Sequence, residues 1–514
     1  MRKFFVAWVL IALVGGAWFA WERWPRPDAP WDELPNRYLV RIDPDLQRAR
    51  IEADIFLSGD MLSMFSVMPV PTLPGGQVDL VENLEVTDSQ GEPLSLRDLG
   101  MGDYALEGRQ RVKLRYAVRL EHDRHAWPAG KEEVGYRTEE GLMLTGASLF
   151  FADGGDKMQG PIEVEFELPS DWRAVTPWER DGSGRYIMQT RRELLSNALF
   201  LGTIASETVE VGGISLTLAL GRRYVPSRDL FVDLLRTQLE GYVELFGGKP
   251  RAGRYLIIIN EDAGGDGGAF VGSFSQFVAG DADERNRVIW GYVMAHELLH
   301  FWNGLSIVPT DYREEWFKEG ATDYLTIASL AKNGLIDETL LFKRLENVPR
   351  RYLIARYAQG LGMSVREAGK DKQPNRQLVY GGGSLAALAL DVELRVRSDD
   401  RVGLPQLMQS LHAEFGVAGG KTYSLDDIER HAQLLTGADF APFFDRVVES
   451  GDYFDIRPSL TELGLRMDSF VEEMFIAQEP QATAVQRARF AAIFVPSGQT
   501  AAPAVPATAA APAP

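Results

Sequence analysis

The sequence predicts an α+β fold: an N-terminal all-β, sandwich-like domain, then a mixed α/β domain, then a mainly helical C-terminal part. Up to about residue 221, apolar residues recur at every second position in several runs, as in strands with one buried face. From about residue 287 they recur at helical spacing instead, between clear helix start and stop signals. A chain of 514 residues, 45% hydrophobic and 25% charged, is large enough for two or three domains.

The first residues form a candidate membrane segment. Arg2 and Lys3 precede an uncharged apolar run over 4–21, which is close to the length that crosses a bilayer. We expect an anchor or signal segment over 1–24 and a short stalk over 25–35. An uncleaved anchor is favoured because the small-residue cleavage pattern is poor. It would place the rest of the chain on the periplasmic side of a bacterial inner membrane, whereas cleavage would give a secreted protein.

The β domain is expected over 36–221. Its strands are predicted by alternation within 49–57, 112–120 and 162–168, where apolar residues alternate with charged ones. Val209–Leu216 predicts a hairpin with a turn at its two central glycines. We interpret this domain as a structural or recognition module.

The pattern changes near residue 222, where we place the start of a second domain over 222–395. Ser227 is positioned to cap an apolar helix that ends at Gly247-Gly248, and Tyr255–Ile259 predicts a strand. The glycine-rich run that follows lacks the lysine of a phosphate-binding loop, so we expect it to form a rim of the cleft. The remaining expected parts are a helical region over 396–478 and an irregular, Ala/Pro-rich disordered tail over 479–514.

The segment 291–304 carries a metal-binding pattern. It contains two of the six histidines, His296 and His300, with Glu297 beside the first. Residues four apart on a helix lie on one face, so both imidazoles could bind one Zn²⁺. Glu297 then lies beside the metal, in the place of a general base for a zinc-bound water. A surface helix with a histidine pair is the alternative, but the apolar neighbours favour a buried pair that needs a metal partner.

A third ligand is expected at Glu319, nineteen residues after His300, because catalytic zinc sites use three protein ligands and leave one position to water. Glu319 and Asp323 are four residues apart on a predicted helix from about Asp311 to Asn333. One carboxylate could ligate zinc while the other accepts the N–H of a ligand histidine. Aromatic residues on both sides favour Glu319 as the ligand, whereas Asp323 could equally be a helix-surface aspartate.

These motifs resemble a known family of enzymes. The stretches His296-Glu-Leu-Leu-His-Phe-Trp-Asn303 and Trp316-Phe-Lys-Glu-Gly-Ala-Thr-Asp-Tyr324 look like those of gluzincin zinc metallopeptidases. Within that group they resemble the glycyl aminopeptidase family, a relative of the alanyl aminopeptidase and leukotriene hydrolase family. A further similarity is Tyr380, with a glycine three residues on and then an apolar helix. The resemblance covers roughly residues 36 to 465 and is strongest at these motifs.

The resemblance implies a thermolysin-like catalytic domain, with one Zn²⁺ per chain held by the two histidines and Glu319. It also implies that the hydroxyl of Tyr380 stabilises the oxyanion of the tetrahedral intermediate. A donor placed at that developing charge is worth about 2.7–4 kcal/mol. Without the resemblance, a core tyrosine that opens a helix would be the simpler interpretation of Tyr380.

The chain departs from the family before the zinc helix. The family has Gly-Gly-x-Glu-His on an edge strand there, and its glutamate can hold the free amino group of a substrate. This chain has Gly267-Gly268-Ala269-Phe270-Val271 instead, which we take as a substrate-binding segment without a charged anchor for an amine. In addition, only about fifty residues follow the helical part, too few for the PDZ domain that many relatives carry there.

Composition excludes several other classes of function. The chain has no cysteine, so disulfides and thiolate metal sites are excluded and a metal must be held by nitrogen and oxygen. The formal net charge of −19 disfavours nucleic acid as a partner, because nucleic-acid binding needs basic surfaces.

We therefore expect a membrane-tethered zinc metallopeptidase that hydrolyses peptide bonds in peptides or proteins with a zinc-activated water. One alternative is an endopeptidase rather than an aminopeptidase. A second, from another class, is a catalytically weak or inactive binding or scaffold protein with a gluzincin fold, prompted by Phe270. The sequence leaves the substrate preference and the oligomeric state open.

Overall fold

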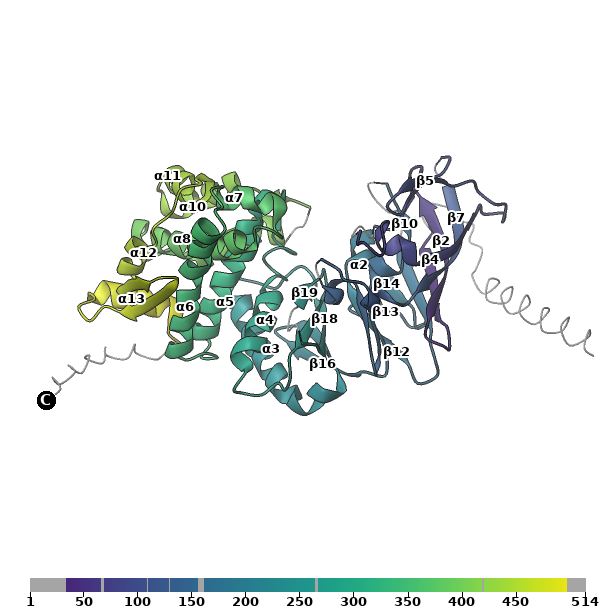
Figure 1. Cartoon of the computed structure of the whole chain (residues 1–514), viewed down its shortest axis with the longest axis horizontal. Coiled ribbons are helices and arrows are strands. Elements are labelled where there is room, and N and C mark those ends of the chain that lie inside the picture. The colour runs from purple at the N-terminus through teal and green to yellow at the C-terminus, as the bar shows by residue number, and fades with distance from the viewer. Residues whose placement is uncertain are drawn as a thin grey trace, which may run out of the picture. The chain divides into compact units, whose positions relative to one another are not determined.

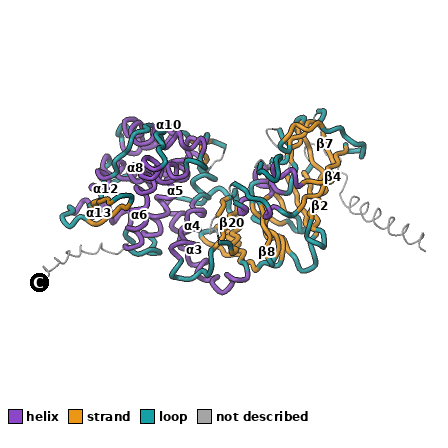
Figure 2. The backbone as a smooth tube through the Cα atoms, viewed as in Figure 1, coloured by secondary structure: helices purple, strands orange, loops and turns teal. Residues whose placement is uncertain are grey.

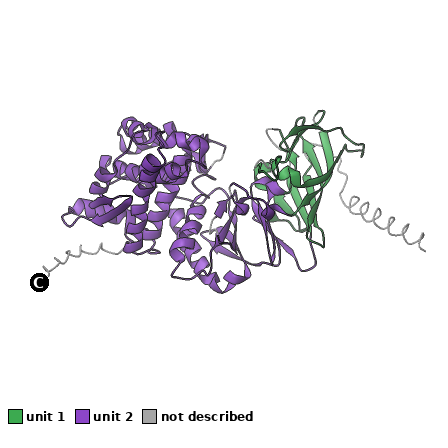
Figure 3. Cartoon of the chain, in the orientation of Figure 1, with its two compact units in different colours: residues 1–120, 149–167, 179–194 green, residues 121–148, 168–178, 195–514 purple. Residues whose placement is uncertain are grey.

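The computed structural model describes residues 34–65, 69–108, 110–128, 130–155, 161–263, 267–417 and 420–496 (Figure 1). The chain divides into two compact units, coloured separately in Figure 3. Unit 1 comprises residues 1–120, 149–167 and 179–194, and unit 2 comprises residues 121–148, 168–178 and 195–514. The predicted α+β fold is confirmed: strands dominate the N-terminal part and helices the C-terminal part (Figure 2).

Unit 1 is built from two β-sheets. The larger sheet has the strand order β13-β14-β11-β1-β2-β7-β4 and the smaller one β10-β3-β6-β5. Only β1 and β11 pair in parallel; the other neighbours are antiparallel. The strands are β1 (Asn36–Ile42), β2 (Arg48–Leu57), β3 (Met61–Ser63), β4 (Val81–Thr87), β5 (Arg97–Gly100), β6 (Asp103–Ala105), β7 (Gln110–Arg119), β10 (Ala152–Asp153), β11 (Ile162–Glu167), β13 (Glu179–Arg180) and β14 (Tyr186–Met188). The short helix α2 (Arg191–Leu195) follows.

The alternation predicted for 49–57 and 112–120 is confirmed in β2 and β7, whose apolar residues are buried on one face. Two buried tyrosines place their hydroxyls against backbone acceptors within unit 1. Tyr38 donates to the carbonyl of Phe151 at 2.9 Å and Tyr116 to that of Leu149 at 2.8 Å. These bonds satisfy polar groups that burial would otherwise leave without a partner.

Unit 2 begins with two further sheets. The first has the order β12-β15-β9-β8 and the second β16-β17-β18-β20-β19. Their strands are β8 (Gly135–Thr138), β9 (Gly141–Thr145), β12 (Arg173–Val175), β15 (Ala198–Gly202), β16 (Ala205–Val211), β17 (Ile214–Leu220), β18 (Arg254–Glu261), β19 (Gly267–Ala269) and β20 (Ser273–Val278). The predicted hairpin around Gly212 and Gly213 is confirmed in β16 and β17, and the predicted strand at Tyr255–Ile259 is confirmed in β18.

The second sheet is buried on both faces, which explains the unbroken apolar run of β18. Tyr255, Ile257 and Ile259 belong to the core shared with the helices. Leu256 and Ile258 point the other way, into a cluster with residues of the first sheet. Through this packing the segments 121–148, 168–178 and 195–221 belong to unit 2. We expected the β domain to continue without interruption to residue 221.

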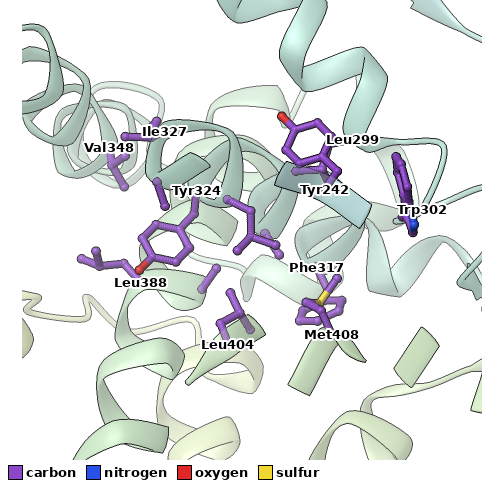
Figure 4. Packing of buried hydrophobic residues seen from close by; sticks show 14 of the residues in the cluster. Tyr242, Leu299, Trp302, Phe317, Tyr324, Ile327, Val348, Leu388, Leu404 and Met408 are labelled. Atoms are coloured by element: carbon purple, nitrogen blue, oxygen red, sulfur yellow. The ribbon is translucent and has the colours of Figure 1, made fainter. Parts of the chain in front are cut away.

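Helices complete unit 2. They are α3 (Arg228–Leu245), α4 (Arg287–Leu299), α5 (Thr322–Lys332), α6 (Glu338–Leu353), α7 (Val365–Ala368), α8 (Gly383–Arg397), α9 (Leu404–Leu411), α10 (Leu425–Thr436), α11 (Ala441–Phe444), α12 (Arg457–Glu462) and α13 (Ala484–Phe494). Short strand pairs join β21 (Val308–Pro309) to β22 (Thr422–Tyr423) and β23 (Leu465–Phe470) to β24 (Glu473–Gln478). Figure 4 shows the core around Tyr242, Leu299, Trp302 and Tyr324.

Several predicted helix boundaries differ from the structure. Ser227 is the N-cap residue of α3, but its hydroxyl donates to the carbonyl of Ala282 instead of capping the helix. Helix α4 ends at Leu299 with His300 as its C-cap residue, and the side-chain amide of Asn303 beyond it donates to the carbonyl of Phe317. Tertiary hydrogen bonds therefore replace the local caps that the sequence suggested.

The prediction of an irregular tail over 479–514 is wrong for its first part. α13 begins with a capping box in which Thr483 accepts from the backbone of Gln486 and the Gln486 side chain accepts in return. Phe490 and Phe494 bury their rings in the core. The cap and this pair four residues apart make a helix there.

The candidate membrane segment over 1–24 lies outside the described residues. Among the described residues, no helix has both the length and the apolar character needed to span a bilayer.

Candidate metal centre and active site

Helix α4 and its C-cap residue, His300, bring the imidazoles of His296 and His300 to one buried face, as their spacing predicts. Their Nε2 atoms lie 3.1 Å apart, and the two rings are nearly perpendicular. The exposed fraction of each residue is about one twentieth, 6% and 5%. Two imidazole nitrogens that face each other at this distance cannot both carry a hydrogen, so the arrangement is suited to a shared cation.

Glu319 completes the set of ligand atoms from a different element. It lies on a π-helical turn, η7 (Trp316–Ala321), that precedes α5. Its Oε2 lies 3.2 Å from His300 Nε2 and 3.5 Å from His296 Nε2. Oε2 is buried and has no hydrogen-bond partner among the described residues. Three ligands about 2.0–2.1 Å from one tetrahedral ion would lie about 3.3–3.4 Å apart, so the three observed separations fit such an ion.

Asp323 fixes the orientation of His296. Its Oδ1 lies 3.0 Å from His296 Nδ1 and accepts from the hydroxyl of Tyr292 at 2.8 Å, while Oδ2 accepts from Arg351 at 2.7 Å. Burial works against the charge of Asp323, but His296 and Arg351 outweigh it and lower the pKa of Asp323 to about 2. A permanent carboxylate at Nδ1 leaves Nε2 of His296 available to a metal.

His300 is oriented by the backbone. Its Nδ1 lies 2.9 Å from the carbonyl oxygen of Asn303 and is the donor of that bond when Nε2 faces a metal. The side-chain amide of Asn303 donates to the carbonyls of Phe317 and Lys318. Asn303 therefore connects the end of α4 to the turn that carries Glu319.

Two lysines keep Glu319 ionised. Lys318 Nζ lies 3.2 Å and Lys372 Nζ 3.1 Å from Glu319 Oε1, and both also contact Glu315. Burial alone would raise the pKa of Glu319, but Lys318 and the two histidines hold it well below its usual value. The lysines contact Oε1, which leaves Oε2 directed at the histidines.

Glu297 and Tyr380 lie beside the three ligands and line the same pocket. Glu297 is half-buried on α4. Tyr380 lies on a second π-helical turn, η10 (Gln377–Gly382), with its ring centre 6.1 Å from that of His296. Burial, then Glu319 and Glu297, raise the pKa of Tyr380 well above its usual value, so its hydroxyl keeps a proton to donate.

Two glycines allow the turn that carries Glu319 to approach the start of α8, which directly follows the turn that carries Tyr380. A Cβ atom added to Gly320 would lie 2.2 Å from the carbonyl carbon of Gly383, and one added to Gly383 would lie 2.4 Å from the carbonyl oxygen of Trp316. Only glycine permits this approach of backbone to backbone. π-helical turns occur often at functional sites, and both of these turns carry a predicted site residue.

Comparison with known families agrees with this geometry. Residues 69–202 match the model of the peptidase M61 N-terminal domain, and residues 291–375 match that of M61 glycyl aminopeptidase. These matches concern the two segments 69–202 and 291–375 of the chain. The resemblance to the glycyl aminopeptidase family is thereby confirmed.

A solved structure shares the fold of this chain. It is described as an aminopeptidase N family protein from Idiomarina loihiensis and superposes with a TM-score of 0.72 at 20% sequence identity. The similarity covers 85% of this chain and 79% of the other. Among curated proteins, none matches the sequence.

The pocket beside the three proposed ligands has a volume of about 690 Å³, within the usual range for ligand sites. Gly267, Gly268 and Ala269 line it as part of the edge strand β19, as the sequence suggested. Phe270 is not among its lining residues; it packs against the cluster of Tyr136 and Phe200. Phe270 therefore does not replace a substrate-binding group inside the pocket.

Sequence reasoning missed several residues that line the pocket. Glu132 and Glu133 belong to a short turn, η3 (Lys131–Glu133), and Glu133 is so close to Gly268 that a Cβ there would lie 2.6 Å from its Cγ. Further examples are Tyr292, Arg351, Lys372 and Arg376. Apart from Tyr292, which lies one turn before His296 on α4, these residues belong to no motif, and tertiary packing brings them to the site.

Proposed function

We propose that the chain is a zinc-dependent peptidase whose zinc is held by His296, His300 and Glu319. The observation that carries the proposal is the convergence of three buried ligand atoms at separations of 3.1 to 3.5 Å, beside a pocket of peptide size. Nitrogen and carboxylate ligands in tetrahedral geometry favour zinc over the larger, oxygen-preferring cations. A bound Zn²⁺ supplies a Lewis acid that makes water a better nucleophile and polarises the scissile carbonyl.

Residues of the chain transfer the proton, stabilise the developing charge and orient the metal ligands. Glu297 takes the proton of the attacking water and delivers it to the leaving nitrogen. Tyr380, kept protonated by its surroundings, donates a hydrogen bond to the carbonyl oxygen as negative charge develops there. Asp323 holds His296 in place, and Asn303 does the same for His300 through its backbone carbonyl.

An aminopeptidase mode is favoured over an endopeptidase mode by the acidic wall of the pocket. Glu132 and Glu133 line the pocket beside the edge strand, where a substrate strand would pair. Their carboxylates supply the negative charge that Phe270 lacks, so a free ammonium group has a partner there.

Cleavage-site mapping on a mixture of peptides with free and acetylated N-termini tests the proposal. We expect cleavage that needs zinc, stops with a chelator, returns with added zinc, and is confined to peptides with a free N-terminus. Cleavage of both sets would identify an endopeptidase. Absence of any zinc-dependent cleavage would favour the alternative of a binding or scaffold protein.

A further inference from the structure

The pocket has a cationic wall in addition to its acidic one. Lys318, Arg351, Lys372 and Arg376 line it. The first three are committed to carboxylates of the metal site: Lys318 and Lys372 to Glu319, and Arg351 to Asp323. Their charges are therefore offset within the protein, and they are not available to a substrate at full strength.

Arg376 differs from the other three cations. Its side chain is exposed, and no carboxylate lies within 4 Å of it among the described residues, although the chain carries a net charge of −19. Its guanidinium carbon lies 5.5 Å from the ring centre of Tyr380. Because Arg376 lines the pocket beside the residue proposed to hold the carbonyl oxygen, its charge can act on whatever occupies the pocket.

The positions of the two walls give a substrate its direction. The acidic residues come from η3 beside β19, whereas Arg376 immediately precedes the turn η10 that carries Tyr380. A peptide whose amino group lies at the acidic wall and whose carbonyl lies at Tyr380 has its leaving residue near Arg376. Because one residue spans about 3.3–3.6 Å, a carboxylate on the leaving residue is within reach of this side chain.

We propose that Arg376 binds a carboxylate on the leaving residue of the substrate, so that the enzyme prefers short peptides with an anionic group there. The planar guanidinium suits a carboxylate because it can donate two parallel hydrogen bonds. The carboxylate is either the C-terminal group of a dipeptide or the side chain of an aspartate or glutamate. The inference rests on the proposed function, since it assumes that peptides occupy the pocket.

The test measures binding rather than turnover. Zinc-loaded Glu297→Gln protein is titrated by calorimetry with Ala-Ala and with its C-terminal amide, and then with the amides of Ala-Glu and Ala-Gln. We expect the charged member of at least one pair to bind about tenfold or more tightly, as for a hydrogen-bonded ion pair. Adding Arg376→Gln should abolish this ratio of affinities between the charged and the neutral member, while the neutral member binds as before. The pair that shows the ratio identifies the source of the carboxylate.

Lys370→Gln is the matched control. It removes one positive charge six residues away, from an exposed lysine that does not line the pocket, and it should preserve the ratio. The inference is overturned if the charged peptide still binds more tightly than the neutral one in Arg376→Gln. It is also overturned if neither pair of peptides shows such a difference. If the affinity ratio depends on Arg376 but the wild type cleaves no peptide, the result supports carboxylate recognition. It then refutes the peptidase function instead.

Discussion

Glu297 and Glu319 are both acids of the metal centre, but their surroundings assign them different roles. Glu319 is buried, with an exposed fraction of 3%, and is held by two lysines, whereas Glu297 is half-buried and lines the pocket. A ligand needs a fixed position, and a general base needs access to water. The different burial of the two glutamates agrees with the roles assigned from sequence.

Glu297→Gln should therefore retain zinc but lose turnover. The amide keeps the size of the side chain and removes its basicity, so kcat should fall about 10²–10⁴-fold, the usual contribution of a general base. Steady-state kinetics on a peptide found by cleavage mapping, together with the zinc content of the variant, checks this. Full activity would remove Glu297 from the mechanism.

Tyr380→Phe should lower kcat about 10²–10³-fold with little change in KM, because the hydroxyl acts on the charge that develops during the reaction. The ring and its packing between Arg351 and Arg376 remain in the variant. An unchanged kcat in zinc-loaded Tyr380→Phe would mean that the tyrosine only fills space.

His122 makes the folded protein sensitive to acid. Burial, with a contribution from His125, lowers the pKa of His122 to about 3, and neither ring nitrogen has a hydrogen-bond partner among the described residues. The unfolded chain binds this proton near pH 6.5. The neutral form thus stabilises the folded state fully above about pH 6.5, and this stability is lost as the pH falls towards 3.

His122→Leu should reduce the acid sensitivity of unfolding. We expect the urea midpoint of the wild type to fall more between pH 7.5 and 5 than that of the variant. Parallel pH dependence in the two proteins would show that His122 titrates normally.

The three proposed metal ligands could be singled out from the sequence because each of them belongs to a contiguous motif with fixed geometry. His296 and His300 are one helical turn apart, and Glu319 lies in a recognisable stretch. Glu132, Lys372 and Arg376 could not be predicted in this way, because each comes from a separate turn and reaches the pocket only through tertiary packing. Phe270 was misleading for the same reason: its place in a motif did not reveal that its ring packs away from the pocket.

At the scale of elements, the predicted helix from Asp311 to Asn333 is three pieces in the structure. Asp311 caps a short 3-10 turn, the π-helical turn η7 follows, and α5 begins at Thr322. Apolar periodicity does not distinguish α from π geometry, so the sequence could predict the helix but not the wider turn that presents Glu319. The same limitation applies at Tyr380.

Gly320→Ala should displace Glu319. The added methyl group would meet the backbone of Gly383 at 2.2 Å, and no flexible side chain is there to move. We expect a loss of stability of about 1–3 kcal/mol together with weaker zinc binding, measured by denaturant unfolding and by competition with a chelator. Gly362→Ala is the control, since nothing lies within 4 Å of a Cβ at that position. Equal zinc affinity in both variants would contradict the account of the two glycines.

At the scale of the whole molecule, the two units alternate along the chain. Unit 2 includes the segments 121–148 and 168–178, which lie in the region expected to form the β domain. One of these segments supplies Glu132 and Glu133 to the pocket. Boundaries drawn at changes of composition assume that each unit is continuous in sequence, so they could not reveal that this N-terminal segment takes part in the site.

The matches to the two M61 models, the grouping of the three proposed ligands and the pocket all support the proposal of one metal-dependent reaction centre. The most direct measurement is the zinc content of the purified wild-type protein and of Glu319→Ala, by mass spectrometry of the metal after dialysis. The account predicts one zinc per chain in the wild type and a large loss in the variant, with both proteins folded by circular dichroism. A folded wild type that binds no zinc, or a Glu319→Ala protein that binds as much as the wild type, would contradict it.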